Sequence, residues 1–395
     1  MSRLEPTNEA SAMQKEISTI AEQGGGTTKV EQLIQQYCPD GVEYVKIGQI
    51  AQVGTGSSNG NEADDEGMYP FFVRSQTVKR KNDYEYDEEA VIIPGEGGIG
   101  DIFHYINGKY ALHQRVYRIH FTIPSINTKF AFYYLKSAFK QFILMKAVSA
   151  TVASIRKPMI EGFPIPIPPL HVQEEIVRIL DTLTELQAEL QAELQKRLQQ
   201  YNYYRDNLLS FEGRTDIEWK KLGEICNLSR GKVYSKSYIE KNAGEYPVYS
   251  SQTANNGELG RISTYDYDGE YLTWTTDGAY AGTIFYRKGK FSITNVCGLI
   301  SPKEDNLNIK FLFYWLSIKA PDYVYRGMGN PKLMSNQMEP IKVPIPPLAE
   351  QQRIVSILDR FNTQTTDITA GVPAEIETRR KQYEYYRDQL LTFKQ

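Results

Sequence analysis

The chain has 395 residues, enough for roughly two to three domains, and its 41% hydrophobic and 24% charged residues are those of an ordinary folded protein. It has no run of eighteen apolar residues and no secretion signal, so we expect a cytoplasmic protein without a membrane span. The net charge of −3 excludes nonspecific coating of nucleic acid but permits a local basic surface. Three scattered cysteines, Cys38, Cys226 and Cys297, argue against a disulfide framework or a zinc site.

The first half of the chain is predicted to be a small α+β domain at 29–165, after a flexible leader at 1–28. Apolar and polar residues alternate in short aromatic-rich stretches such as EAVIIPG at 89–95 and DIFHYING at 101–108, which predicts β-strands. One helix is predicted at 127–147.

A helical unit is predicted at 166–212, directly after this domain. Its apolar residues recur at steps of three and four, which is the spacing of a coiled-coil stripe. A helix of about forty residues, at about 1.5 Å each, is a rod of roughly 60 Å. QAEL occurs twice in tandem at 187–194. This is good helix-forming sequence, and we hypothesise that it also sets the distance between two domains.

The same order of elements follows again. A second α+β domain is predicted at 213–343, with a strand in YLTWTTDG (271–278) and a helix near 308–320. A second helical unit is predicted at 344–395. Within it, Gly371 and Pro373 should kink or restart the helix before Ala374, because proline cannot continue a helix from within.

The chain therefore repeats itself. PIPPLHVQEEIVRILD (166–181) corresponds to PIPPLAEQQRIVSILD (344–359), and YNYYRDNLLSF (201–211) corresponds to YEYYRDQLLTF (383–393). Duplication normally gives a pseudo-two-fold object, which suits a two-fold ligand or paired partners. A narrow apolar stripe on a long helix needs a partner, so the two helical units are predicted to pack antiparallel.

No set of residues for catalysis is found. Gly95, Gly97 and Gly100 form a GxGxxG pattern, but an aromatic strand pattern follows it where a dinucleotide site needs a helix. We interpret this segment as a glycine-rich hairpin or loop beside a ligand. Phosphate-loop, zinc-protease, GxSxG and adenine-methyltransferase motifs are also missing from the sequence. The prediction is a binding protein without a metal or cofactor of its own.

Short basic and amide-rich stretches of the two α+β domains are the candidate nucleic-acid contacts. Arg and Lys bind phosphates or guanine edges, and Gln and Asn pair with adenine. Each such residue could equally be a solvated loop side chain, but comparable positions recur in both halves with different side chains, as two different half-sites would require. The candidates are Arg74, Ser75, Gln76, Lys79, Arg80, Lys81, Arg156 and Lys157, and in the second half Arg230, Lys232, Lys236, Ser250, Ser251, Gln252, Asn330 and Lys332.

The repeated pattern PIPPL-x-x-Q-x-x-IV-x-ILD, followed by Y-x-YYRD-x-LL, resembles the specificity subunit of type I restriction–modification enzymes over roughly residues 29–395. The resemblance implies an α+β fold with two pseudo-symmetric target-recognition domains, separated by two long antiparallel helices that form a coiled coil. Each domain would read half of a bipartite site in double-stranded DNA, and the helices would fix the spacer.

The same resemblance implies partner subunits that carry the chemistry. Two modification subunits would use S-adenosylmethionine to methylate adenine, and restriction subunits would use ATP and Mg²⁺ to translocate DNA, so this chain would not be catalytic. The QAEL tandem and the Gly371/Pro373 break each occur in one helical unit only, so the two units are not equivalent. Candidate partner contacts are Tyr203, Tyr204, Arg205, Tyr385, Tyr386 and Arg387.

Two alternatives stay open at this point. The tyrosines of the helical units could seal the helices against the domains instead of contacting partners. The whole chain could be a tandem scaffold that binds other proteins, because its 28 tyrosines suit extensive interfaces and its net charge is acidic. The tandem repeats weigh against this scaffold interpretation.

Overall fold

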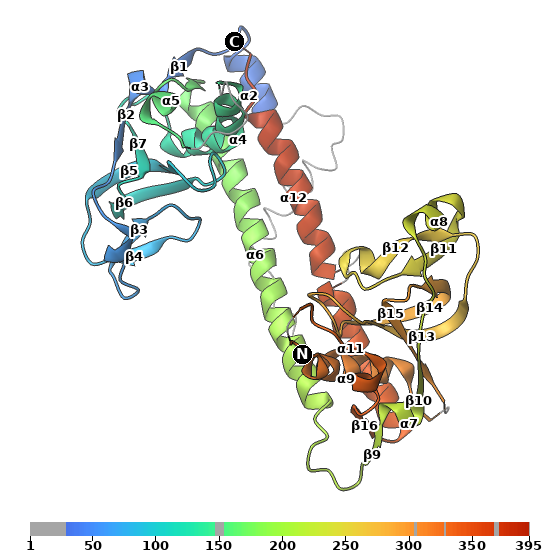
Figure 1. Ribbon diagram of the computed structural model, residues 1–395. Coiled ribbons are helices and arrows are strands. Elements are labelled where there is room, and N and C mark those ends of the chain that lie inside the picture. Colours follow the sequence, from blue (N-terminus) through green and yellow to red (C-terminus); the bar gives the residue numbers. More distant parts are fainter. Residues whose placement is uncertain (1–28, 147–153, 304–305, 328, 367–370, 395) are drawn as a thin grey trace. The chain divides into compact units, whose positions relative to one another are not determined.

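The computed structural model describes residues 29–146, 154–303, 306–327, 329–366 and 371–394 (Figure 1). The predicted leader lies outside the described residues. The chain divides into two compact units, of which unit 1 joins the chain up to Leu190 with Ile376–Gln395, and unit 2 is Gln191–Glu375. Each unit thus combines one α+β domain with parts of both helical repeats, so the domain bounds predicted from the sequence stay a prediction.

Unit 1 is built on a mixed six-stranded sheet with the strand order β2-β7-β5-β6-β3-β4. Its strands are β2 (Ala51–Thr55), β3 (Tyr69–Phe72), β4 (Lys79–Lys81), β5 (Tyr86–Pro94), β6 (His104–Leu112) and β7 (Val116–Phe121). The central strand β5 pairs antiparallel with β6 and β7, while β3 runs parallel to β6. Val91, Ile92 and Ile93 are all fully buried, and since consecutive residues point to opposite faces, both faces of β5 are covered.

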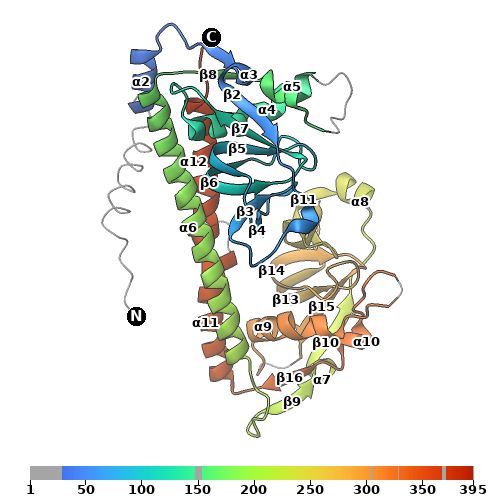
Figure 2. The ribbon, with the colours of Figure 1, turned by 90° about the vertical axis from the view of Figure 1, so that its left-hand side faces the viewer.

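Helices cover the sheet of unit 1 and connect it to the helical repeats (Figure 2). Its smaller elements are α2 (Lys29–Tyr37), β1 (Tyr44–Lys46), α3 (Ile47–Ile50), η1 (Gly60–Glu62), α4 (Thr128–Lys146), α5 (Lys157–Glu161) and β8 (Pro164–Pro166). Val172 and Ile176, near the start of α6 (Leu170–Leu208), share a core with Tyr386 and Leu390, at the end of α12 (Gly371–Leu390). The start of one helix thus meets the end of the other, so they run antiparallel in unit 1.

The C-terminal segment also closes unit 1 beyond α12. The backbone N–H of Val42 donates to the carbonyl of Lys394 at 3.0 Å, and the Tyr44 hydroxyl donates to the carbonyl of Phe393 at 3.2 Å. These contacts join segments that are about 350 residues apart in the chain.

Unit 2 repeats the sheet of unit 1 strand for strand, in the order β10-β15-β13-β14-β11-β12. Its strands are β10 (Cys226–Arg230), β11 (Ala243–Tyr249), β12 (Glu258–Ile262), β13 (Tyr267–Thr275), β14 (Ile284–Ile293) and β15 (Cys297–Pro302). Trp274 of the central strand β13 is fully buried and lies against Gly298 of β15. A Cβ atom at Gly298 would lie 2.3 Å from the indole ring, so only glycine fits there.

The helices of unit 2 follow the same plan as those of unit 1. They and the small strands are β9 (Glu218–Lys221), α7 (Leu222–Ile225), α8 (Lys236–Lys241), η2 (Ala254–Gly257), α9 (Ile309–Lys319), η3 (Ala320–Tyr323), α10 (Ser335–Met338), β16 (Lys342–Ile345) and α11 (Leu348–Thr366). Leu209 and Phe211, which follow α6, share a core with Ile354 and Leu358 of α11. The end of α6 meets the start of α11, so this pair is antiparallel as well.

The predicted helices at 127–147 and 308–320 are confirmed as α4 and α9, and the three quoted strand segments overlap β5, β6 and β13. The predicted rod is α6, a single helix of 39 residues and therefore about 58 Å long. In the second repeat α12 is described from Gly371, before Ala374, and the predicted kink or restart stays a prediction because residues 367–370 lie outside the described part of the chain. Pro373 lies in the first turn of α12, where the missing N–H has no intrahelical partner to lose.

Candidate nucleic-acid interface

A fully buried glutamine in each unit ties the start of a helical repeat to the α+β domain. In unit 1 the Gln173 side chain accepts a hydrogen bond from the N–H of Asn127 at 2.8 Å and donates to the carbonyls of Ser125 and Pro168 at 2.8 and 2.7 Å. The matching groups of unit 2, at 2.7–3.0 Å, are Gln351 with Asn308, Asn306 and Pro346. Each amide satisfies three backbone groups, so replacing it would leave them unpaired.

An aspartate two turns further along each repeat makes a second tie. The Asp181 carboxylate accepts from the Lys129 ammonium and from the Tyr133 hydroxyl, both at 2.6 Å. Burial and this hydrogen bond raise the pKa of Tyr133 far above its ordinary value. The matching groups of unit 2, also at 2.6 Å, are Asp359 with Lys310 and Tyr314. The Gln and Asp of the repeated motif therefore orient each helix on its domain.

In unit 1 several exposed arginines gather where the central strand β5 ends. The Glu96 carboxylate lies 2.9 Å from Arg115 and 3.0 Å from Arg74, and the hydrogen bonds from these guanidinium groups lower the pKa of Glu96. The N–H of Ile155 donates at 2.8 Å to the carbonyl of the residue before Glu96, which brings Arg156 to the same loop. The structure thus joins the predicted residues Arg74 and Arg156, and it adds Arg115, which the sequence did not single out.

The GxGxxG segment is a loop, as predicted, and no helix starts in it. It follows β5, and Gly97, Gly98 and Gly100 have φ values of 72°, 66° and 70°. This left-handed backbone favours glycine over any residue with a Cβ atom. A phosphate site of the dinucleotide type needs a helix N-terminus here, so the local geometry does not support one.

The three basic residues of β4 differ in how free their side chains are to bind a phosphate. Lys79 is exposed and has no ion pair among the residues that the structure describes. Arg80 donates to the carbonyl of Met68 at 2.8 Å and to that of Gly67, so its guanidinium is bound to the segment that precedes β3. Lys81 is mostly buried and lies 2.7 Å from Glu62 and 3.2 Å from Asp83. Only Lys79 is therefore well placed for a phosphate.

The other candidates of unit 1 are side chains of exposed loops and helix ends. Gln76 is exposed, and the neighbouring Ser75 hydroxyl donates to the carbonyl of Thr77 at 2.8 Å. Lys157 begins α5 and lies 3.5 Å from Glu161.

In unit 2 the candidates converge on Thr276, which follows the central strand β13 as Gly95 follows β5. The Thr276 N–H donates to the Ser251 hydroxyl at 3.0 Å, and the Arg230 guanidinium lies 3.4 Å from the Thr276 hydroxyl. The N–H of Leu333 donates to the Thr276 carbonyl at 2.8 Å, as Ile155 does to Gly95 in unit 1. This hydrogen bond places the segment of Asn330 and Lys332, both exposed, beside the same loop.

Some candidates of unit 2 hold their own loops together. The Ser250 hydroxyl accepts from Thr294 at 3.1 Å, and the side chains of Ser251 and Gln252 donate to the carbonyls of Val296 and Glu258. The remaining two are exposed lysines: Lys232 is paired with Asp266, and Lys236 begins α8.

Two tyrosines near Thr276 were missed by the sequence reasoning. Tyr280 and Tyr325 are 65% and 62% exposed, although tyrosine is usually at least half buried. The N–H of Lys332 donates to the carbonyl of Tyr325 at 3.0 Å, so this ring stands on the predicted segment. Tyr280 lies between Gly278 and Gly282, and Tyr325 is followed by Gly327 and Gly329, and this nearness of glycines was the signal that could have found them.

The candidate partner tyrosines separate into an outer and an inner member of each pair. Tyr203 and Tyr385 are 67% and 60% exposed. Tyr204 stacks on Phe361 of α11 with ring centroids 5.3 Å apart, and Tyr386 is only 8% exposed within the core of unit 1. Arg205 and Arg387 each pair with the next aspartate, at 2.8 and 2.7 Å. Tyr204 thus packs between two helices and Tyr386 in the core of unit 1, which leaves Tyr203 and Tyr385 as the accessible candidates.

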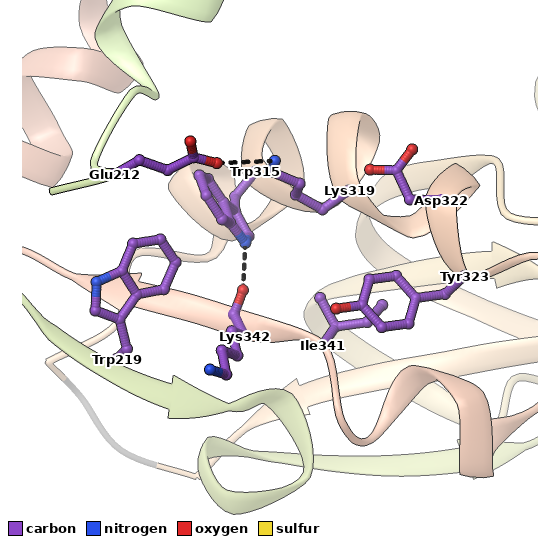
Figure 3. A pocket seen from close by; sticks show the side chains of 8 residues that line it. All are labelled: Glu212, Trp219, Trp315, Lys319, Asp322, Tyr323, Ile341 and Lys342. Carbon is purple, nitrogen blue, oxygen red and sulfur yellow. Dashed lines mark hydrogen bonds and ion pairs between the residues drawn. The ribbon is translucent and has the colours of Figure 1, made fainter.

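A cavity of about 400 Å³ in unit 2 is lined by three aromatic side chains, Trp219, Trp315 and Tyr323, together with charged residues and Ile341 (Figure 3). Trp315 donates from its indole N–H to the carbonyl of Lys342 at 2.9 Å, and Lys319 lies 3.9 Å from Glu212. No nucleophile with an adjacent base is found in its lining. Among the described residues, no group of three or more His, Cys, Asp or Glu could hold a metal ion, and no helix is long and apolar enough to cross a membrane.

Comparison with known proteins agrees with this duplicated arrangement. The family model of the type I restriction modification DNA specificity domain matches twice, at residues 39–200 and 215–378. A protein of Mycoplasma pneumoniae described as a type I specificity subunit is 45% identical over 226 residues, which is 55% of this chain and 89% of that protein. The specificity subunit of the Escherichia coli enzyme EcoR124I/EcoR124II is 34% identical over 255 residues, which is 58% of this chain and 63% of that protein.

The fold is also similar to a solved structure. The type I restriction–modification S subunit of Mycoplasma genitalium superposes with a TM-score of 0.61 at 18% identity, over 89% of this chain and 95% of that one. Specificity subunits work in complexes with DNA and with modification and restriction subunits, to which the cofactors belong. The chain therefore belongs to the type I restriction–modification specificity subunits, as a non-catalytic DNA specificity subunit with two target recognition domains.

Proposed function

We propose that each unit reads one half of a bipartite sequence in double-stranded DNA. The observation that carries this proposal is that the two units share one strand order but present different side chains where the central strand ends. Exposed arginines surround Glu96 after β5 in unit 1, whereas Arg230, Ser251 and Lys332 surround Thr276 after β13 in unit 2. Basic side chains would bind phosphates and set the register, while loop side chains would discriminate bases in the grooves.

The helical repeats set the spacer between the two half-sites in this proposal. One turn of B-DNA is about 34 Å, and a helix of 39 residues is about 58 Å long, so α6 has the length to match one to two turns. The boundary between the units on α6 falls after Leu190, between the two QAEL copies, and no residue from 184 to 200 is buried. This stretch could therefore change its length without disturbing a core.

Two modification subunits would dock on the helical repeats, one on each. The support is the repeated exposed tyrosine, Tyr203 in one repeat and Tyr385 in the other, each followed two residues later by an Arg-Asp pair. Exposed tyrosines supply large contact area at low entropic cost. The bound modification subunits would transfer the methyl group of S-adenosylmethionine to adenine, and restriction subunits with ATP and Mg²⁺ would move the DNA.

The test is a genome-wide map of methylated adenines in cells with the complex and in cells lacking this chain. We expect a bipartite motif that disappears without the chain. Deleting residues 191–194 shortens α6 by about 6 Å and should shorten the spacer by one or two base pairs while both half-sites stay unchanged. The matched control exchanges Glu193 for Gln at constant length. An unaltered spacer in the deletion variant would refute the role of α6.

A further inference from the structure

Arg287 of β14 is a buried guanidinium with unused donors. It is 2% exposed, and its Nε donates to the Thr273 hydroxyl at 3.1 Å. Neither Nη1 nor Nη2 has a hydrogen-bond partner among the described residues. No carboxylate of the described chain forms an ion pair with it, and burial lowers its pKa. A charge buried without a partner is unfavourable, so its presence calls for a reason.

Two aromatic rings hold the guanidinium in place. Its central carbon lies 3.6 Å from the ring centroid of Tyr249 and 4.4 Å from that of Phe285. Arginine stacks well on aromatic faces, which leaves the donors at the edge of its planar group free for another ligand. The side chain is therefore held in position while its hydrogen-bonding edge stays unused.

One segment of the chain, residues 252–257, lies against this edge at Nη2. Gly257 has a φ of 78°, and a Cβ atom added there would lie 2.9 Å from Nη2 of Arg287. The preceding Asn255 and Asn256 are exposed and both have a φ of 50°, which is uncommon for two consecutive residues with a Cβ atom. This covering segment, residues 252–257, begins at Gln252, one of the candidate DNA contacts.

Unit 1 shows that the fold shared by the two units does not require an arginine at the position of Arg287. Arg287 pairs with Tyr271 across β13 and β14, and the matching pair in β5 and β6 is Ala90 with Ile106. Ile106 packs against an apolar cluster that contains Phe72. The arginine is thus a difference between the two units and not part of their shared core.

We propose that Arg287 is a specificity-determining residue of unit 2 that binds a guanine in its half-site. On DNA binding, residues 252–257 move aside and the two free N–H groups donate to O6 and N7 of the base. A guanine edge presents two acceptors at the spacing of the guanidinium fork. This proposal rests on the proposed function of unit 2 as a DNA reader.

The experiment compares the parent complex with Arg287→Ile, which carries the residue of unit 1, and with Arg287→Lys, which keeps the charge and loses the fork. We expect both variants to relax one guanine of the second half-site in the map of methylated adenines. Affinity for the parent site should fall about 10- to 100-fold. The first half-site and the spacer should stay unchanged. Ile106→Val, at the matching position of unit 1, is the control and should leave the second half-site unchanged.

Two further measurements separate the possible failures. Hydrogen exchange of residues 253–257 in the parent complex should change when the parent duplex is added, and unaltered exchange would overturn the proposed movement even if a variant failed to fold. A variant with an unchanged motif, at equal or uniformly weaker affinity, would overturn the role of Arg287. A parent complex without any bipartite motif would instead overturn the proposed function.

Discussion

The two units place the same strands in the same order but present different side chains at the end of the central strand. Their common features are polar contacts of the helical repeats: the buried Gln173 and Gln351 make the same three hydrogen bonds, and the half-buried Asp181 and Asp359 bind the same pair of groups. The differing residues lie mainly on exposed loops, where substitutions cost little stability. A few shared polar contacts can therefore preserve the fold while the exposed loops that are proposed to contact DNA diverge.

Removal of the buried glutamines should lower the free energy of unfolding of the two units most strongly. Gln173→Ala leaves three buried backbone groups unpaired, so we expect it to lower the free energy of unfolding of unit 1 by about 2–4 kcal/mol. Gln351→Ala should do the same to unit 2. Urea titration followed by hydrogen exchange of each unit measures both effects. Gln76→Ala, at an exposed position, is the control, and equal loss in both units from one variant would contradict the comparison.

The aspartate contacts should matter less, because they are partly exposed to solvent. Asp181→Asn removes the charge that Lys129 and Tyr133 bind, and we expect a loss of about 1–2 kcal/mol in unit 1. Asp359→Asn should have the same effect in unit 2. A double-mutant cycle with Lys129→Met isolates the ion pair. A coupling free energy near zero would show that the carboxylate acts on the tyrosine alone.

Alkaline pH should weaken both units through the same pair of tyrosines. Burial, followed by the hydrogen bond to aspartate, raises the pKa of Tyr133 and of Tyr314 in the folded chain. The unfolded chain loses these protons near pH 10 while the folded chain keeps them, so this stabilisation is complete below pH 10. It is lost above pH 10, by about 1.4 kcal/mol per pH unit and tyrosine. Urea midpoints from pH 8 to 11 should fall less steeply in Tyr133→Phe, and Tyr203→Phe, which is exposed, should follow the parent.

Removal of single surface charges should give the smallest effect, and it should distinguish the exposed basic residues of the two units by their effect on DNA binding. Lys79→Ala removes an exposed, unpaired ammonium, so the salt dependence of DNA binding by the complex should flatten by about one counterion. Lys232→Ala should change it less, because Lys232 is already paired with Asp266. Binding isotherms at several salt concentrations measure both slopes. Identical slopes for Lys79→Ala and the parent would remove Lys79 from the interface.

The sequence was sufficient for the features that depend on local pattern. Apolar periodicity predicted α4, α6 and α9, and the repeated motifs predicted the duplicated architecture. The role of Gln173 was out of reach, because its partner Asn127 lies 46 residues away and only the folded chain brings them together. Arg115 and Arg287 were missed for the same reason, since an arginine in a strand or loop looks like a solvated charge until its neighbours are known.

The closure of unit 1 by residues 392–394 has a consequence for the order in which the protein is made. Unit 2 is contiguous in the chain, so all of it has been synthesised before Ile376 is added. Unit 1 begins first but waits for Phe393 and Lys394 to reach Tyr44 and Val42. We expect a chain that ends at Glu375 and has been released from the ribosome to protect unit 2 from proteolysis and to leave unit 1 susceptible, so that the first domain translated is the last one completed.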